Sequence, residues 1–189
     1  MRPGARRLRR APAFLALVAL LPGAAGAAVF ETQEQALSRA FPPPARVIRT
    51  TSYLSEGQLE AARKAAQAPV DSAVVTRYAA FDTDGTLLGT IYFDAHVVRT
   101  AREVLMVVVA ADRTVRSVDV LAFGEPQDYL PRGGWLKRVE GKRQEDGLFV
   151  GRALAHVTGA TLTTRAIAAA VRRVLAVHSL LETPAPPGD

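Results

Sequence analysis

The sequence contains no cysteine, and this absence excludes several kinds of chemistry. Disulfides, iron–sulfur ligation, thiol redox chemistry and a lipid-anchored cysteine all require a thiol. Histidine is also scarce: His96, His156 and His178 are the only three, and their separations match no metal-ligand spacing. We therefore interpret each as a structural or surface histidine and expect no metal site.

Excess positive charge is nearly absent outside the N-terminus. The chain of 189 residues has a net charge of +6, but residues 1–27 hold five arginines and no acidic residue. The remaining residues include 19 basic and 18 acidic side chains, so their charges nearly cancel. A nucleic-acid partner is therefore not expected. The length suits one domain with a sizeable core.

The first 27 residues have the pattern of a secretory signal peptide. A basic stretch ends at Arg10, an apolar run covers 13–21, and small residues at 25–27 suit a signal peptidase. Cleavage after Ala27 would place the protein in the periplasm or another extracytoplasmic compartment. The alternative is a retained membrane anchor over residues 11–30, which the prolines and glycines in that stretch disfavour.

Helices are expected at two places in the first third of the chain. Residues 28–46 are predicted to hold a short helix, over 31–41, and a proline-rich linker. Ser55 and Gln58 then have the spacing of a capping box, which predicts a helix to about residue 66.

The middle of the chain is rich in β-forming residues. Strand patterns cover 47–53, 72–81, 87–93, 104–109 and 115–123, with turn signals at Asp84-Gly85 and Asp112-Arg113. Consecutive strands joined by short turns predict an antiparallel meander. With helices on either side and no βαβ repetition, the fold class is α+β.

The C-terminal part is expected to be a loop followed by a long helix. Residues 125–135 are rich in proline and glycine, a short helix is predicted over 135–140, and a long amphipathic helix over 165–181. Residues 182–189 are proline-rich and predicted to be disordered. The apolar face of the long helix is expected to hold Ile167, Ala170, Val171, Val174 and Leu175, and the polar face Arg165, Arg172 and Arg173.

One string of residues resembles the nucleophile motif of haloacid-dehalogenase-type phosphatases. It runs Phe81-Asp82-Thr83-Asp84-Gly85-Thr86. In that family the motif ends the first strand of a parallel α/β domain, whereas here a second strand follows at once. An Asp-Gly hairpin turn accounts for the same letters, so the phosphatase is a remote alternative.

A second string, just before the last helix, carries a more extensive resemblance. Thr158-Gly159-Ala160-Thr161-Leu162-Thr163 places hydroxyls and small residues where a helix begins, a position that favours phosphate. The string resembles the flavinylation motif of the FMN-binding domain family, found in small exported flavoproteins and in subunits of the Rnf and NQR redox complexes. The resemblance extends over the meander and the closing helix, and the domain is expected to span residues 47–181.

The resemblance implies FMN as cofactor, joined as a phosphoester to Thr161 by an FAD-dependent flavin transferase. Thr158, Gly159, Ala160, Leu162 and Thr163 would then surround the phosphate. An exposed loop is expected there, with Thr163 or Thr164 capping the helix. The family's motif has an aspartate three residues before Thr158, and this chain has Ala155 there. If this aspartate helps the transferase to recognise its target, its absence affects the covalent attachment of FMN and not the binding of FMN.

Four further residues are candidates for contacting the flavin. The aromatic side chains of Tyr129 and Trp135 could stack on its ring, with packing in the core or loop as the alternative for both. Arg132 could face a reduced flavin and His156 the phosphate.

The resulting hypothesis is an exported electron carrier with FMN and with membrane or periplasmic redox partners. We expect an electron carrier rather than an enzyme with its own substrate. The alternative is a structural subunit of a membrane redox complex, with FMN bound non-covalently or not at all.

Overall fold

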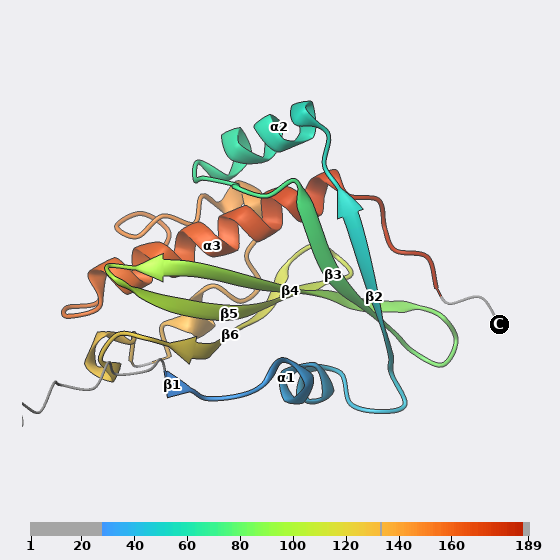
Figure 1. Cartoon of the computed structure of the whole chain (residues 1–189), viewed down its shortest axis with the longest axis horizontal. Helices are drawn as coiled ribbons and strands as arrows, with labels where there is room; N and C mark the ends of the chain where they lie inside the picture. The colour runs from blue at the N-terminus through green and yellow to red at the C-terminus, as the bar shows by residue number, and fades with distance from the viewer. Residues whose placement is uncertain (1–27, 133, 187–189) are drawn as a thin grey trace, which may run out of the picture.

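The computed structural model describes residues 28–132 and 134–186, and the predicted signal peptide lies outside them. The protein is one antiparallel sheet with a long helix across one face and a short helix on the other (Figure 1). This confirms the α+β class. The six strands lie in the order β1-β6-β5-β4-β3-β2. Their bounds are β1 Ala28–Val29, β2 Arg46–Tyr53, β3 Val74–Phe81, β4 Leu87–Val98, β5 Ala101–Ala110 and β6 Val115–Phe123.

Three α-helices and three short 3-10 helices complete the fold. They are α1 Gln33–Ala40, α2 Glu56–Ala66, η1 Gln127–Tyr129, η2 Leu136–Arg138, η3 Gln144–Asp146 and α3 Thr161–Leu180. Thr32 is the N-cap of α1 and Ser55 is the N-cap of α2, and each forms a complete capping box. No helix in residues 28–132 and 134–186 is long and apolar enough to cross a membrane.

Both predicted hairpins are present. Asp82 closes the turn between β3 and β4 by accepting hydrogen bonds from the N–H groups of Asp84 and Thr86 at 3.0 and 2.7 Å. The residues of the phosphatase-like string therefore form a turn between antiparallel strands, as the hairpin interpretation predicts. The predicted meander also continues from β4 to β5, but both strands are longer than predicted: β4 extends five residues beyond the expected end at Phe93, and β5 begins three residues before the expected start at Val104.

Two apolar cores lie on opposite faces of the sheet. The larger packs strands β4–β6 against α3 and the segment 135–157, and its members include Leu105, Val107, Trp135 and Ile167. The smaller packs α1 and Phe41 against the other face. Because β1 pairs with β6 and α1 covers a core, residues 28–40 contribute to the folded unit. The domain boundary at residue 46 remains a prediction.

The predicted apolar face of α3 is confirmed, but its polar face is not. Ile167, Val171 and Leu175 are buried against the sheet. Arg172, expected in solvent, is also buried, because α2 and the segment around η3 cover that side of α3. Its guanidinium donates to the carbonyls of Ala66 and Leu148, both at 2.7 Å. The helix is thus enclosed on two sides.

The C-terminal tail is in part described. Residues 182–186 follow α3, and Arg77 donates a 2.7 Å hydrogen bond to the carbonyl of Glu182. Residues 187–189, the rest of the segment predicted to be disordered, lie outside the described residues.

Candidate functional site

The helix α3 begins earlier in the chain than predicted. The helix starts at Thr161, four residues before the predicted start, so Thr161 is its first residue rather than part of a loop. Gly159 has φ +83°, a left-handed conformation that glycine adopts without strain, and it turns the chain into the helix. The expected capping by Thr163 or Thr164 is wrong. Both side chains are buried inside the first turn, with 1% and 0% of their surface exposed.

The start of α3 has no capping side chain. The N-cap residue is Ala160, which offers no oxygen, and its ψ of 22° is not the extended conformation that side-chain capping uses. Within the described part of the chain, no acceptor bonds the N–H groups of Thr161, Leu162 and Thr163. Free N–H groups and the positive end of the helix dipole favour an anion.

A pocket of about 150 Å³ lies at this helix start. We call it the α3 pocket; its lining residues are Arg99, Tyr129, Gly159, Thr161, Leu162 and Thr163. Arg99 comes from the turn between β4 and β5, where it has φ +54°, and its guanidinium lies 5.0 Å from the centre of the Tyr129 ring. The pocket therefore combines a hydroxyl, free N–H groups and a cation, which together suit a phosphate.

Glu125 holds the turn that carries Arg99. One carboxylate oxygen of Glu125 accepts hydrogen bonds from the N–H and hydroxyl of Thr100 and from the N–H of Ala101, at 2.9, 3.1 and 3.0 Å. These bonds, the one from the Thr100 N–H foremost, lower the pKa of Glu125. Glu125, two residues after the end of β6, thereby fixes the turn of the neighbouring β4–β5 hairpin.

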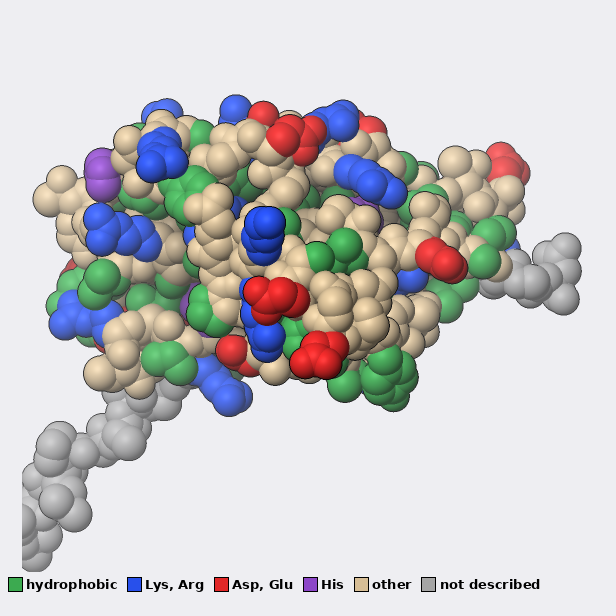
Figure 2. All heavy atoms as spheres, turned by 90° about the horizontal axis from the view of Figure 1, so that it is seen from above, with side chains coloured by type: hydrophobic (Ala, Val, Ile, Leu, Met, Phe, Trp, Pro, Cys, Tyr) green, Lys and Arg blue, Asp and Glu red, His purple; other side chains and the backbone are tan. Residues whose placement is uncertain are grey.

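Positive charge gathers around this end of the molecule. In Figure 2, Lys and Arg side chains predominate at the end where α3 begins, and acidic side chains lie mostly over the middle and the opposite end. Such a distribution favours the approach of an anionic ligand to the α3 pocket.

The structure brings together five of the predicted site residues and separates the rest. Thr161, Gly159, Leu162, Thr163 and Tyr129 line the α3 pocket, and Ala160 supports it as the buried N-cap. Four candidates do not line it: Thr158, His156, Arg132 and Trp135. Thr158 is exposed, and the His156 side chain lies over Gly151. Arg132 forms an ion pair with Asp128 at 2.7 Å.

Trp135 is part of the core, as the packing alternative predicts. Its side chain is 2% exposed, and its indole N–H donates a 2.8 Å hydrogen bond to the carbonyl of Ala155. Trp135 therefore positions the segment before the motif and presents no open ring face. The Ala155 side chain is exposed, so an acidic side chain at this position would be in solvent.

Arg99 was missed by sequence reasoning. It lies in a stretch without a recognised turn signal, and only the pairing of β4 with β5 brings it to the start of α3. Nothing in the local sequence distinguishes it from the other arginines.

Comparison with known families indicates which cofactor this protein binds. Residues 102–176 match the family model of the FMN-binding domain. Over this segment, which is less than half of the chain, the sequence is similar to FMN-binding domains. FMN is therefore its cofactor, and the matched segment runs from β5 into α3 and includes the motif at 158–163. Searches of curated proteins and of solved structures give no match.

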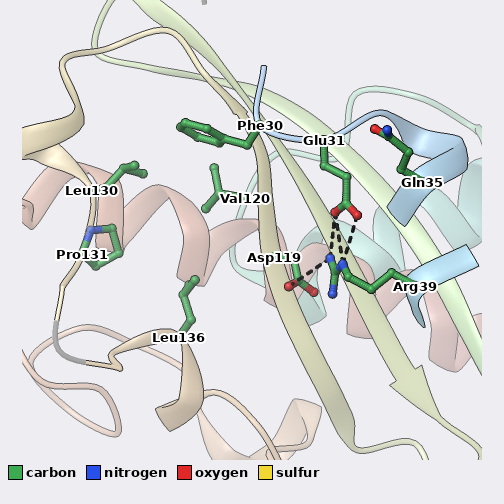
Figure 3. Close-up of a pocket in the computed structure, with 9 residues that line it drawn as sticks. All are labelled: Phe30, Glu31, Gln35, Arg39, Asp119, Val120, Leu130, Pro131 and Leu136. Atoms are coloured by element: carbon green, nitrogen blue, oxygen red, sulfur yellow. Dashed lines mark hydrogen bonds and ion pairs between the residues drawn. The ribbon is translucent and has the colours of Figure 1, made fainter. Parts of the chain in front are cut away.

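The α3 pocket fits the phosphate of FMN, but it is too small for the whole cofactor. Pockets that enclose ligands of such size measure roughly 300–1,000 Å³. A hollow of about 700 Å³ lies at the β1–β6 edge of the sheet, between Phe30 and Leu136 (Figure 3). There Arg39 pairs with both Glu31 and Asp119, at 2.9 and 3.3 Å, so its charge is already balanced. A second hollow, of about 590 Å³, lies between β3 and β4.

Proposed function

We propose that this protein is an exported electron carrier whose FMN is attached to Thr161 through a phosphoester. The observation that carries the proposal is the position of the Thr161 side chain within the FMN-binding domain. Thr161 lines the α3 pocket beside Arg99 and the free N–H groups of the first turn, where a phosphodiester charge would be balanced. A threonine hydroxyl is unreactive unaided, so attachment needs a flavin transferase.

The attachment step would use FAD as the donor. The Thr161 oxygen forms a bond to the phosphorus of the FMN half, the pyrophosphate bond of FAD breaks, AMP leaves, and the hydroxyl proton passes to solvent. The exposed Thr158 and Gly159 leave the approach to the helix start open, and a Cβ built on Gly159 would meet no atom within 4 Å.

A covalent cofactor fits the proposed location. An exported protein has no cytoplasmic pool from which lost FMN could be replaced, and a tether removes this loss. The signal-like residues 1–27 motivate the export proposal. Electrons would then pass between redox partners in the periplasm or at the membrane, with FMN supplying the redox chemistry and the protein setting its environment.

Ala155 favours a second candidate, a subunit that holds FMN without a covalent bond or not at all. If the missing aspartate is needed by the transferase, attachment fails while the α3 pocket still binds the phosphate. Because the Ala155 side chain is exposed, Ala155→Asp restores the family pattern without disturbing the core.

Mass spectrometry of the denatured protein separates the two candidates. The full chain is produced with its N-terminal segment beside a flavin transferase. The electron-carrier proposal expects a mass gain of FMN less water, which is abolished in Thr161→Ala and retained in the control Thr83→Ala, an exposed threonine outside the motif.

The other outcomes each have a defined meaning. Unmodified protein that co-purifies with yellow flavin supports the non-covalent candidate, and a gain of the adduct in Ala155→Asp would then identify Ala155 as the cause. A colourless protein that binds no added FMN contradicts both candidates. Wild-type adduct that persists in Thr161→Ala contradicts the assignment of Thr161.

A further inference from the structure

The strands β3 and β4 separate after the hairpin that joins them (Figure 1). They pair only near the turn, from Tyr78 with Ile91 to Phe81 with Leu87. Beyond this, residues 74–77 of β3 pair with β2, and residues 92–98 of β4 pair with β5. A hollow of about 590 Å³ lies between the separated ends, and Arg173, Val174 and Val177 of α3 form its wall. We call it the β3/β4 groove.

The β4 side of this groove is an open strand edge. In an antiparallel strand every second residue turns its N–H and C=O toward the same neighbour, so part of the 92–98 backbone points into the groove. Within residues 28–132 and 134–186, no strand pairs with this edge. Val97 and Val74, which are 62% and 51% exposed, flank the opening on the two strands. Open edges with apolar neighbours are normally covered in natural proteins, so a ligand is expected here.

A polar cluster lines the same groove next to α3. The guanidinium of Arg173 donates to both oxygens of Asp94, at 3.0 and 2.7 Å. Asp94 also bonds Nδ1 of His96 at 2.8 Å, and Nε2 of His96 lies 2.9 Å from a carboxylate oxygen of Glu103. Glu103 is fully buried, and its other oxygen has no hydrogen-bond partner. The cluster fixes the Arg173 side chain at the wall of the groove.

The groove adjoins the α3 pocket. Val97, near the end of β4, lines the groove, and Arg99, in the turn directly after β4, lines the α3 pocket, so the two residues are only two positions apart in the chain. Both hollows are also bordered by α3. A ligand whose phosphate lies at Thr161 can therefore extend into the groove. The hollow in Figure 3 lies at the β1–β6 edge of the sheet, and because its Leu130 follows Tyr129 of the α3 pocket, it is the alternative place for the ring.

We propose that the β3/β4 groove holds the isoalloxazine ring of the FMN, with its pyrimidine edge hydrogen-bonded to the free edge of β4. This inference rests on the proposed function. The pyrimidine edge presents a carbonyl, an N–H and a second carbonyl, which complement the N–H and C=O groups of a strand edge. Val74, Val97 and Val174 provide apolar surface for the ring faces, and the volume of the groove is within the range of ligand pockets.

Arg173 acts in this proposal as a positioning residue that also balances the charge of the Asp94 carboxylate beside the ring. Without this pairing, the Asp94 carboxylate would disfavour the reduced, negatively charged flavin and lower the midpoint potential. Asp94 and His96 hold the guanidinium in place.

The experiment uses the full chain loaded with FMN, either by the transferase or by added FMN, and compares two matched variants of β4. Val97→Glu places a carboxylate at the mouth of the groove. Leu88→Glu makes the same change at a 36% exposed residue in the part of β4 that pairs with β3. Flavin fluorescence quenching by neutral acrylamide reports the exposure of the ring, and a redox titration reports its potential.

In the wild-type protein, we expect a quenching constant severalfold below that of free FMN. Val97→Glu should raise it toward the free value and lower the midpoint potential, while Leu88→Glu leaves both unchanged. Arg173→Gln should also lower the potential, with Arg173→Lys restoring part of it.

Three results overturn the inference, and only the third also overturns the proposed function. If FMN binds but its ring is quenched as in free FMN, the ring is outside the groove and the edge is available for another occupant, such as an extended peptide. If FMN is shielded but Val97→Glu and Leu88→Glu behave alike, the ring lies elsewhere. If no FMN binds in either loading, both proposals fail.

Discussion

The helices α2 and α3 pack against each other, yet they begin in different ways. At the start of α2, Ser55 has an extended backbone with ψ 164°, and its side chain and that of Gln58 form a complete capping box. At the start of α3, Ala160 has ψ 22° and provides no cap. The start of α2 is therefore stabilised by its own side chains, whereas the start of α3 leaves N–H groups free for an anion. The position of α3 must then depend on contacts along its length.

The largest effect is expected where the body of α3 contacts α2. Arg172→Leu keeps apolar bulk but leaves the carbonyls of Ala66 and Leu148 without their buried donor. We expect the free energy of unfolding to fall by about 2–4 kcal/mol in urea denaturation. The exposed Arg165→Leu is the control and should change it by less than about 0.5 kcal/mol. Equal stability of the two variants would show that the body of α3 does not provide this support.

The next effect is a dependence of the free energy of unfolding on pH. It arises from His178, which belongs to α3, and from His96, whose partner Asp94 bonds Arg173 of α3. Burial lowers the pKa of His178 to about 4, and its Nδ1 shares a 2.9 Å hydrogen bond with the Tyr92 hydroxyl. Burial also acts to lower the pKa of His96, but bonds to Asp94 and Glu103 outweigh it and raise the pKa to about 9.

These two shifts have opposite signs. The unfolded pKa is near 6.5 for both, so the His178 contribution is present above pH 6.5 and is lost as the pH falls toward 4. The His96 contribution is present below pH 6.5 and is lost as the pH rises through 9. We expect each loss to be on the order of 2 kcal/mol. Thermal melts from pH 4 to 10 should show the acid limb reduced in His178→Gln and the alkaline limb reduced in His96→Gln. Unchanged limbs would contradict these assignments.

A smaller effect is expected from the cap of α2. Ser55→Ala removes the acceptor for the Gln58 N–H, whose bond to Ser55 is 3.2 Å. The cost should be about 1 kcal/mol in urea denaturation. Thr32→Ala at the start of α1 makes the matching change in a second capping box and should cost a similar amount.

The smallest effect is expected at the start of α3. Ala160→Ser introduces a hydroxyl at a buried residue, where the backbone does not direct it to the first-turn N–H groups, so we expect no gain in the free energy of unfolding in urea denaturation. A gain as large as the cost of Ser55→Ala would show that the start of α3 is an ordinary helix start, and the comparison between the two helices would fail.

Local signals allowed the prediction of the hairpins and of the buried face of α3. Asp84-Gly85 and Asp112-Arg113 specify turns from neighbouring residues alone, and the helical spacing of Ile167, Val171 and Leu175 needs no tertiary information. The start of α3 was placed too late because the threonines at 161, 163 and 164 were interpreted as cap and loop residues, whereas burial against the core holds Thr163 and Thr164 in the helix.

The features that were not predicted depend on contacts between distant segments. Arg172 is buried because α2, more than 100 residues earlier, supplies a carbonyl for it. Arg99 reaches the α3 pocket only through the β4–β5 register. The β3/β4 groove exists only because β3 pairs with β2 and β4 pairs with β5 beyond the short stretch where β3 and β4 pair with each other. The motif at 158–163 was recognisable because its residues are contiguous.

The hydrogen bond between Trp135 and Ala155 gives the protein an internal optical probe. Trp135 is the single tryptophan of the chain, so all indole emission originates from one buried ring beside the segment that leads into the motif. Flavin absorbs in the region where tryptophan emits, and a nearby flavin therefore quenches that emission by energy transfer. The ratio of indole to flavin fluorescence would then report the fraction of molecules that carry cofactor, during maturation and without any added label.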